Sequence, residues 1–312
     1  MSRKLTNYIA LTLRGMGMGA ADVVPGVSGG TIAFITGIYE ELVNSIRLIN
    51  AGAFKHLFSK GIGAFWKQIN GNFLVAVFLG IFISVFSLAK LLEHLLHTYP
   101  ILVWSFFLGL IVASAIYVAK RITHWNLKKI AGLLTGIAVA YMITELTPAQ
   151  TPEASWFIFI SGALAICAMI LPGISGAFIL LLLGKYQFVV GAVGNLNLSV
   201  LAILIVGALV GIISFSNILS WLLKKYHDVT IAVLAGFMVG SLNKIWPWKK
   251  TVSTFIDRHG EIQPLVQKNV LPSEFAAQTG QDPLLLQALI LAGVGFALIF
   301  TIEGITKIKF KA

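Results

Sequence analysis

The chain has 312 residues, of which 57% are hydrophobic and 11% charged, and its mean hydropathy is +0.89. These values lie outside the range of soluble domains, so the sequence predicts an integral membrane protein. The net charge of +11 would suggest nucleic-acid binding in a soluble chain, but here it indicates membrane topology, and no nucleic-acid partner is expected. The single cysteine, Cys167, excludes an internal disulfide framework and a cysteine-built metal site.

The first predicted helix runs from Leu5 to Ala20 and carries Arg14, which argues against a cleavable signal peptide. Proline and glycines in DVVPGVSGGT, residues 22–31, then break it, and a second helix is expected over residues 31–47. One helix over this whole segment would be about 65 Å long, against a hydrocarbon core of about 30 Å. We therefore expect a re-entrant hairpin that enters and leaves the membrane on one side.

Further elements follow in chain order. Residues 54–69 alternate apolar and basic side chains as one helix in the headgroup layer would. A second hairpin is predicted over residues 155–191, and residues 244–283 are expected to form an outer loop or small cap whose tryptophans, Trp246 and Trp248, suit an interface belt. Full spans are predicted over residues 73–89, 101–119, 130–146, 200–223, 229–243 and 284–305.

The two hairpins are copies of each other. MILPGISGAFILLLLGKYQFVV, residues 169–190, repeats DVVPGVSGGTIAFITGIYEELV, residues 22–43, at a constant offset. A fainter repeat, FLGLIVASA from Phe107 and LAGFMVGSL from Leu234, has small residues at spacings typical of helix packing. The matched pairs of the main repeat are Pro25 and Pro172, Gly26 and Gly173, Ser28 and Ser175, Gly29 and Gly176, Gly37 and Gly184, and Tyr39 and Tyr186.

Charge placement predicts the orientation. With both termini in the cytoplasm, fifteen basic residues and only four acidic ones fall on that side, as the positive-inside rule requires. Three spans then separate the hairpins, so they enter from opposite faces. The predicted fold is an all-α integral membrane protein with two inverted repeats, residues 1–150 and 151–312, each one re-entrant hairpin plus three transmembrane helices. Many secondary transporters share this layout, with their sites at the midplane.

Chemistry is expected where the two bends meet. A helix that begins in low dielectric presents unpaired N–H groups and a positive dipole end, and glycines let an anion approach the backbone. This predicts a phosphate site, for which Arg14 would supply a fixed charge. Alternatively, Arg14 and Asp22 only pair with each other, and the glycines only permit the bends. The candidate substrate-binding residues are Arg14, Asp22, Gly26, Ser28, Gly29, Gly30, Thr31, Gly173, Ser175 and Gly176, with Pro25 and Pro172 as structural bends.

Signs of catalysis are missing from the sequence. No Cys or His cluster has metal-ligand spacing, no Ser-His-Asp set can be assembled, and no Walker-type phosphate loop occurs. We therefore expect no catalytic residue, no metal site and no cofactor.

The motifs resemble those of a known family. PGVSGGT after Arg14, Gly15 and Asp22, followed by GIYE at residues 37–40, is similar to the bacterial polyprenyl-phosphate (undecaprenyl phosphate) transporter family, PopT type. PGISGAFILLLLGKY, residues 172–186, matches the second half of that family, although Met169, Ala177 and Phe178 replace the Asp, Gly and Thr of the first copy. The resemblance implies flipping of undecaprenyl phosphate from the outer to the inner leaflet of the plasma membrane, so that the carrier lipid is reused in cell-envelope synthesis.

Three alternatives stay open. Membrane undecaprenyl-diphosphate phosphatases use a similar bend, but they pair it with glutamates and an arginine that PGVSGGT lacks. An ion-coupled transporter of a small anion and a structural membrane protein are the other two. The expected partners are undecaprenyl phosphate and membrane lipids, while a coupling ion (H+ or Na+) and a homodimer are left open.

Overall fold

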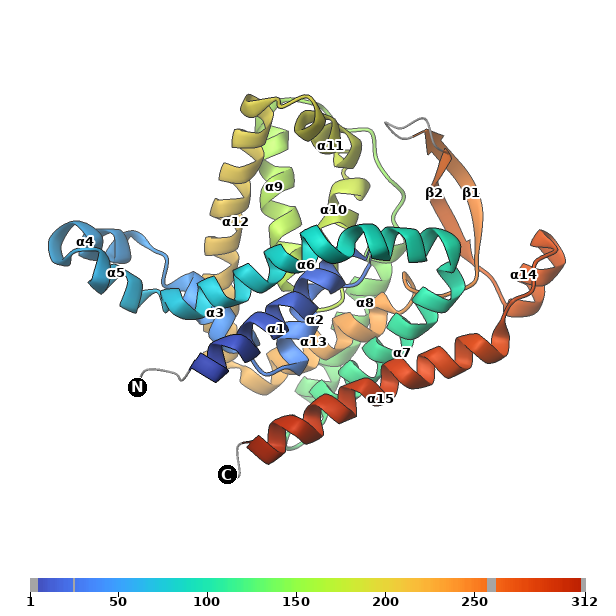
Figure 1. Cartoon of the computed structure of the whole chain (residues 1–312), viewed down its shortest axis with the longest axis horizontal. Coiled ribbons are helices and arrows are strands. Elements are labelled where there is room, and N and C mark those ends of the chain that lie inside the picture. Colours follow the sequence, from blue (N-terminus) through green and yellow to red (C-terminus); the bar gives the residue numbers. More distant parts are fainter. Residues whose placement is uncertain (1–4, 25, 257–261, 310–312) are drawn as a thin grey trace.

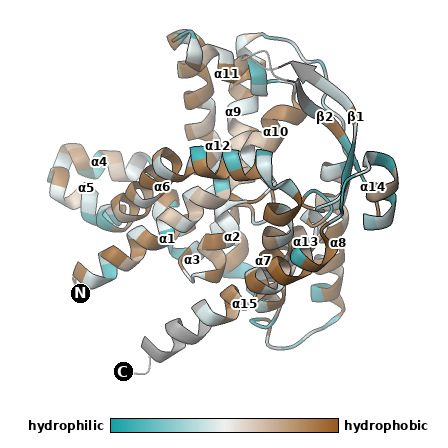
Figure 2. Ribbon diagram, turned by 45° about the vertical axis from the view of Figure 1, so that its right-hand side comes forward, coloured by the Kyte–Doolittle hydropathy of each residue, from teal (hydrophilic) through white to brown (hydrophobic). Residues whose placement is uncertain are grey.

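The computed structural model describes residues 5–24, 26–256 and 262–309, and these are mostly helical, as predicted (Figure 1). Within them, four helices are apolar and long enough to cross a bilayer. Three further apolar helices are shorter: α9 (Ser155–Ile170), α13 (His227–Ser241) and the 285–301 part of α15 (Leu285–Lys309). The four long helices are α6 (Gly71–Thr98), α7 (Pro100–Ala119), α8 (Leu127–Glu145) and α12 (Leu198–Lys225). Figure 2 shows apolar colour along most of these helices.

The first hairpin contains one more break than the sequence predicted. It consists of α1 (Leu5–Val23), α2 (Gly29–Ile35) and α3 (Tyr39–Arg47). The prediction of one helix over residues 31–47 was wrong, because Gly37 takes a φ of +75° and ends the helical path. The returning arm is therefore two short helices joined by a turn.

The second hairpin repeats this construction. Helix α9 is followed by α10 (Gly176–Leu182) and α11 (Tyr186–Gly194), which meet at a 109° bend. Gly184, the counterpart of Gly37, has a φ of +62°. The duplication seen in the sequence thus reappears as the same backbone conformation at matched positions.

The predicted headgroup helix is also split. Gly61, with a φ of +83°, divides it into α4 (Ala51–Lys60) and α5 (Ile62–Gln68). Both project away from the rest of the molecule (Figure 1). Phe58 and Ile62 are 86% and 73% exposed, which is the amphipathic character expected at a lipid surface.

Residues 244–256 and 262–283 form a folded cap that contains the one sheet of the described chain. Strands β1 (Lys249–Ile256) and β2 (Ile262–Asn269) pair antiparallel, and α14 (Pro272–Thr279) follows them. No strand was predicted here from the sequence. Trp248 is buried and donates its indole N–H to the main-chain oxygen of Pro283 at 2.8 Å, so it packs inside the cap rather than in an interface belt.

Glycines bring the long helices into backbone contact. A Cβ on Gly15 of α1 would collide with the carbonyl oxygen of Val77 on α6, and a Cβ on Gly162 of α9 would collide with that of Leu204 on α12. The first helix of each hairpin is therefore closely packed against the long helix that follows the hairpin in its own half. These contacts place the bend of each hairpin in the interior of the molecule.

The remaining pairs connect the two halves. Gly109 of α7 packs against the backbone of Ala292 on α15, and Gly236 of α13 against that of Leu133 on α8. The fainter repeat thus marks helix packing. Both contacts cross the predicted boundary at residue 150, so the last helix of each half packs against the other half. The division into 1–150 and 151–312 stays a prediction.

Candidate functional site

The first bend lies between α1 and α2. Gly26 takes a φ of +86°, which a residue with a side chain rarely adopts. Ser28 is the N-cap of α2 in extended conformation, and its Oγ accepts a hydrogen bond from the N–H of Gly30 at 3.1 Å. Pro25, predicted to form this bend, lies outside the described residues.

Asp22 closes the same bend from the other side. Its Oδ1 accepts a hydrogen bond from the N–H of Gly29 at 2.7 Å, so the carboxylate holds the first turn of α2. Arg14 lies partly exposed on α1, eight residues before Asp22, which is about 12 Å along the helix axis. The contact that the structure gives Asp22 is thus with the backbone of α2.

The second bend lies between α9 and α10. Gly173 takes a φ of +91°, matching Gly26, and Pro172 is buried beside it. Ser175 stands at the N-cap of α10 but makes no side-chain cap hydrogen bond. A Cβ on Gly176 would lie 2.6 Å from the carbonyl oxygen of Ala165, so the start of α10 is pressed against α9.

The two bends are in direct contact. The hydroxyl of Ser28 lies within hydrogen-bond distance of the carbonyl oxygens of Met169, at 3.1 Å, and Leu171, at 3.0 Å. In return, Thr31 Oγ1 accepts a hydrogen bond from the N–H of Gly173 at 3.1 Å. Ser28 and Thr31 are fully buried. The structure therefore brings the predicted site residues of both bends to one place in the interior.

The bends are closed upon each other in this arrangement. The N–H groups of Gly29 and Gly30 are bonded to Asp22 and Ser28, and that of Thr31 to the carbonyl oxygen of Ser28 at 2.9 Å. The backbone donors expected to hold an anion at the first bend are thus already occupied by the protein. An anion could reach them only after the bends part.

A polar cavity of about 370 Å³ lies beside the bends, between the carboxyl ends of α8 and α13 and the β1–β2 hairpin. Lys244 and Lys249 line it. Lys244 packs against the first bend, because a Cβ on Gly26 would lie 3.0 Å from its Cγ. Neither lysine was among the site residues predicted from the sequence. Their spacing around Trp246 and Trp248 was visible, but their position at the bends depends on how the cap folds.

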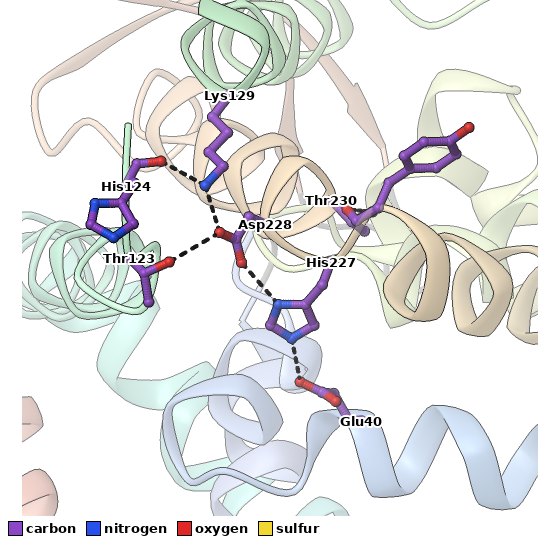
Figure 3. A network of polar contacts seen from close by, with 8 residues as sticks. Glu40, Thr123, His124, Lys129, His227, Asp228 and Thr230 are labelled. Atoms are coloured by element: carbon purple, nitrogen blue, oxygen red, sulfur yellow. Dashed lines mark hydrogen bonds and ion pairs between the residues drawn. The ribbon is translucent and has the colours of Figure 1, made fainter. Parts of the chain in front are cut away.

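At the opposite ends of α8 and α13, charged groups form a network (Figure 3). Asp228 at the start of α13 accepts a hydrogen bond from Lys129 of α8 at 2.6 Å, and the imidazole of His227 lies 3.1 Å from Asp228 and 3.3 Å from Glu40 of α3. Glu40 belongs to the GIYE motif. The network therefore ties the first hairpin to a helix pair from both halves.

An open apolar groove of about 340 Å³ runs between α12 and α13. It is lined by side chains such as Phe215, Leu219, Val233 and Phe237. Its wall includes Leu171, whose carbonyl oxygen is bonded by Ser28. The groove therefore ends at the double bend, the place where the first and second bends are in contact. No group of His, Cys, Asp or Glu with metal-binding geometry occurs among the described residues.

Comparison with known proteins gives the family. A model described as undecaprenyl phosphate translocase-like matches residues 18–263, which include both bends as well as Lys244 and Lys249. The chain belongs to the undecaprenyl phosphate translocase-like family. This agrees with the resemblance carried by the doubled PGxSG motif.

Two relatives of this translocase-like chain are transporters by name. A polyprenyl-phosphate transporter of Vibrio cholerae is 49% identical over 303 residues, covering 97% of this chain and 98% of the relative. A polyprenyl-phosphate transporter of Staphylococcus aureus is 36% identical over 253 residues, covering 75% of this chain and 85% of the relative. No solved structure matches the chain. Both relatives are thus named for the transport of a polyprenyl phosphate.

Proposed function

We propose that the protein transports undecaprenyl phosphate from the outer to the inner leaflet of the bacterial plasma membrane, so that the carrier lipid is reused in envelope synthesis. Family membership supports a polyprenyl phosphate as substrate. The observation that supports the mechanism is the hydrogen bond between Ser28 and Leu171, which holds the two bends together at one buried place. A phosphate would pass through this point when the bends part.

Inverted repeats would make this motion symmetric. The matched contacts of Gly15 with Val77 and of Gly162 with Leu204 support two copies of one unit. If the copies enter from opposite faces, as the basic loops predict with both termini in the cytoplasm, exchanging their conformations reverses the accessible side. Alternating access then follows from the duplication.

The closed state has different groups at its two ends. The network of Glu40, His227 and Asp228 fastens the predicted cytoplasmic end, while the cavity with Lys244 and Lys249 lies at the other. Helices α8 and α13 connect the two ends. In the proposed cycle, a lipid phosphate enters from the cavity end and leaves after the network opens.

The lipid tail has a separate place. A polyprenyl chain is wholly apolar, and the α12–α13 groove presents apolar side chains up to Leu171. The head group could therefore lie at the bends while the tail stays in the groove and in the surrounding lipid. A transporter of a small soluble anion would gain nothing from such a groove.

In this proposal the site residues have distinct roles. Gly29, Gly30, Ser28 and Thr31 offer donors to the phosphate once released from their present partners. Gly173, Ser175 and Gly176 do so from the second bend, and Gly26 keeps the first bend open to backbone approach. Arg14 supplies the fixed positive charge, and Asp22 holds the first turn of α2 until the anion replaces it. A coupling ion, H+ or Na+, and a homodimer stay predictions.

Reconstituted vesicles can test this. Undecaprenyl phosphate is added to the outer leaflet, and a phosphatase that cannot cross the membrane is added at intervals to measure the fraction still outside. We expect this fraction to fall only in vesicles that hold the protein, and Arg14→Ala to lose the effect while Lys60→Ala, an exposed control on α4, keeps it. No difference from empty vesicles would refute transport. Full transport by Arg14→Ala would refute the assigned site, and uptake of inorganic phosphate instead would favour the small-anion alternative.

A further inference from the structure

The cavity at the carboxyl ends of α8 and α13 carries an excess of positive charge. Three lysines line it, Lys244, Lys249 and Lys268, against one carboxylate, Glu145. The Nδ2 of Asn243 donates to Glu145 Oε1 at 2.7 Å, so this carboxylate is already bonded by an amide. The lysines still outnumber this carboxylate, so a ligand would meet a net positive charge.

Aromatic rings hold the two inner lysines. The ammonium of Lys249 lies 4.3 Å from the ring centre of Trp104 and donates to the carbonyl oxygen of Lys244 at 2.6 Å. The ammonium of Lys244 lies 4.4 Å from the ring centre of Phe178. No carboxylate of the described chain is within ion-pair distance of either. An ammonium has three donors, so Lys249 keeps two for a ligand.

Burial raises the free energy of the charged forms of Lys244 and Lys249 when no anion is bound. Burial, together with the neighbouring charge of Lys244, lowers the pKa of Lys249 to about 7. Burial also lowers the pKa of Lys244, although Glu145 opposes that shift. A phosphate monoester carries a charge of about −1.5 to −2 at neutral pH, so its binding would offset both the desolvation and the mutual repulsion.

The cavity borders both bends. The stem of Lys244 packs against Gly26 of the first bend, and Phe178, which lies under its ammonium, is the third residue of α10 after the second bend. One side chain thus touches both. An anion held by Lys244 would be next to the place where Ser28 and Gly173 meet their partners across the bends.

We propose that this cavity is a docking site for a phosphate monoester head group, occupied before the head group reaches the double bend. Lys244 and Lys249 are its charged ligands, with Lys268 at its edge. The proposal rests on the proposed function for its substrate, but it concerns a separate set of residues. Neither the PGxSG motif nor the Arg14 position is part of it.

Binding to the purified full-length protein can test the site. The probes are a short-chain polyprenyl phosphate and inorganic phosphate, titrated separately into wild type, Lys249→Gln and Lys244→Gln. The matched control is Lys250→Gln, which removes the same charge from the next residue in sequence. Lys250 is exposed and lies outside the cavity. We expect each cavity variant to bind the lipid about tenfold more weakly or worse, as loss of a charge-assisted contact predicts, and the control to bind as wild type.

The outcomes separate the cavity from the function. If wild type binds and transports the lipid but both cavity variants bind it equally well, the docking site is refuted and the transport function stands. If wild type binds no polyprenyl phosphate, the proposed function fails as well. If inorganic phosphate displaces the lipid from wild type and does not bind Lys249→Gln, the result supports recognition of the head group alone. Rescue by Lys249→Arg shows that charge is needed and that the Gln variant is not merely misfolded.

Discussion

Thr31 Oγ1 accepts a hydrogen bond from the N–H of Gly173 at 3.1 Å, so a side chain of the first bend satisfies the backbone of the second. The reverse contact is built differently. At the position matching Thr31 the second copy has Phe178, whose ring supports the Lys244 ammonium, and the stem of Lys244 packs against Gly26. The two motifs thus differ in sequence at a position with a different role in each copy. Thr31 of the first copy bonds the opposite bend, whereas Phe178 of the second copy contacts the Lys244 ammonium.

The Thr31 contact should be measurable as stability. Thr31→Val removes the acceptor and leaves the buried N–H of Gly173 without its partner, which costs about 1–3 kcal/mol. We expect a lower melting temperature in detergent. Thr135→Val is the control, because the exposed hydroxyl of Thr135 is bonded only within α8. Equal melting temperatures for both variants would contradict the role of Thr31.

A methyl group at Gly30 should force the bends apart. Its Cβ would lie 2.5 Å from the carbonyl oxygen of Ile170, and that backbone has no free space to retreat. We expect Gly30→Ala to lose most transport in vesicles and to melt at lower temperature. Gly293→Ala on α15, where a Cβ meets nothing within 4 Å, should behave as wild type. Transport by Gly30→Ala at the wild-type rate would show that close approach of the bends is unnecessary.

Anion binding should weaken at alkaline pH. Because burial lowers the pKa of Lys249 to about 7, its charged form is present below that pH and is lost as the pH rises through it, until a bound phosphate raises the pKa again. Lys244 and Lys268 oppose its charge and Glu145 favours it. We expect the affinity for polyprenyl phosphate to fall as the pH rises above about 7 in wild type and to stay level in Lys249→Arg, since arginine keeps its charge. The same fall in both proteins would contradict a role for Lys249.

The folding stability of wild type should show the opposite trend. An unfolded lysine holds its proton up to about pH 10.4, whereas folded Lys249 releases it near 7. The unfolded state therefore binds more protons between these values, and the free energy of unfolding should rise with pH across that window. Lys249→Gln should lack this rise, as melting curves at several pH values can show. A parallel rise in the variant would assign the effect to another group.

The His227 network should stabilise the protein mainly in acid. His227 lies at the tip of α13, before the apolar run that begins at Val229. Burial acts to lower its pKa, but hydrogen bonds to Asp228 and Glu40 outweigh this and raise the pKa above 6.5. The contribution is thus complete below pH 6.5 and is lost as the pH rises through the raised value.

The measurement is the difference in melting temperature between wild type and His227→Gln. It should be largest in acid and shrink toward alkaline pH. His97→Gln, at the exposed end of α6, should show no such trend. A difference that is constant with pH would mean that the charge of His227 does not matter.

Local signals allowed the bends to be predicted. Proline, glycine and serine in apolar sequence predict a break wherever they occur, and the duplication gave two breaks of one kind. The turns at Gly37 and Gly184 were missed even though both glycines were matched in the repeat. A glycine inside an apolar run is compatible with a helix, so its positive φ becomes visible only in the structure.

The lysine cavity could not be predicted from the sequence. Lys244 and Lys249 lie in a stretch that reads as a polar loop, and the pairing of Lys249 with Asn269 is set by a partner strand twenty residues away. Only that pairing folds the loop back over α8 and α13. The closed state of the bends was equally hidden, because the partners of Ser28 are carbonyl oxygens, which every residue possesses.

The glycine seams between helices limit how this molecule can change shape. Where Gly15 meets Val77 and Gly162 meets Leu204, main chain rests on main chain, with no layer of flexible side chains to slide through. The first helix of each hairpin and its partner helix must then move together as one rigid body. The hinges left to the protein are the glycines with positive φ at the bends. A molecule of many helices would therefore change shape at only a few hinge residues.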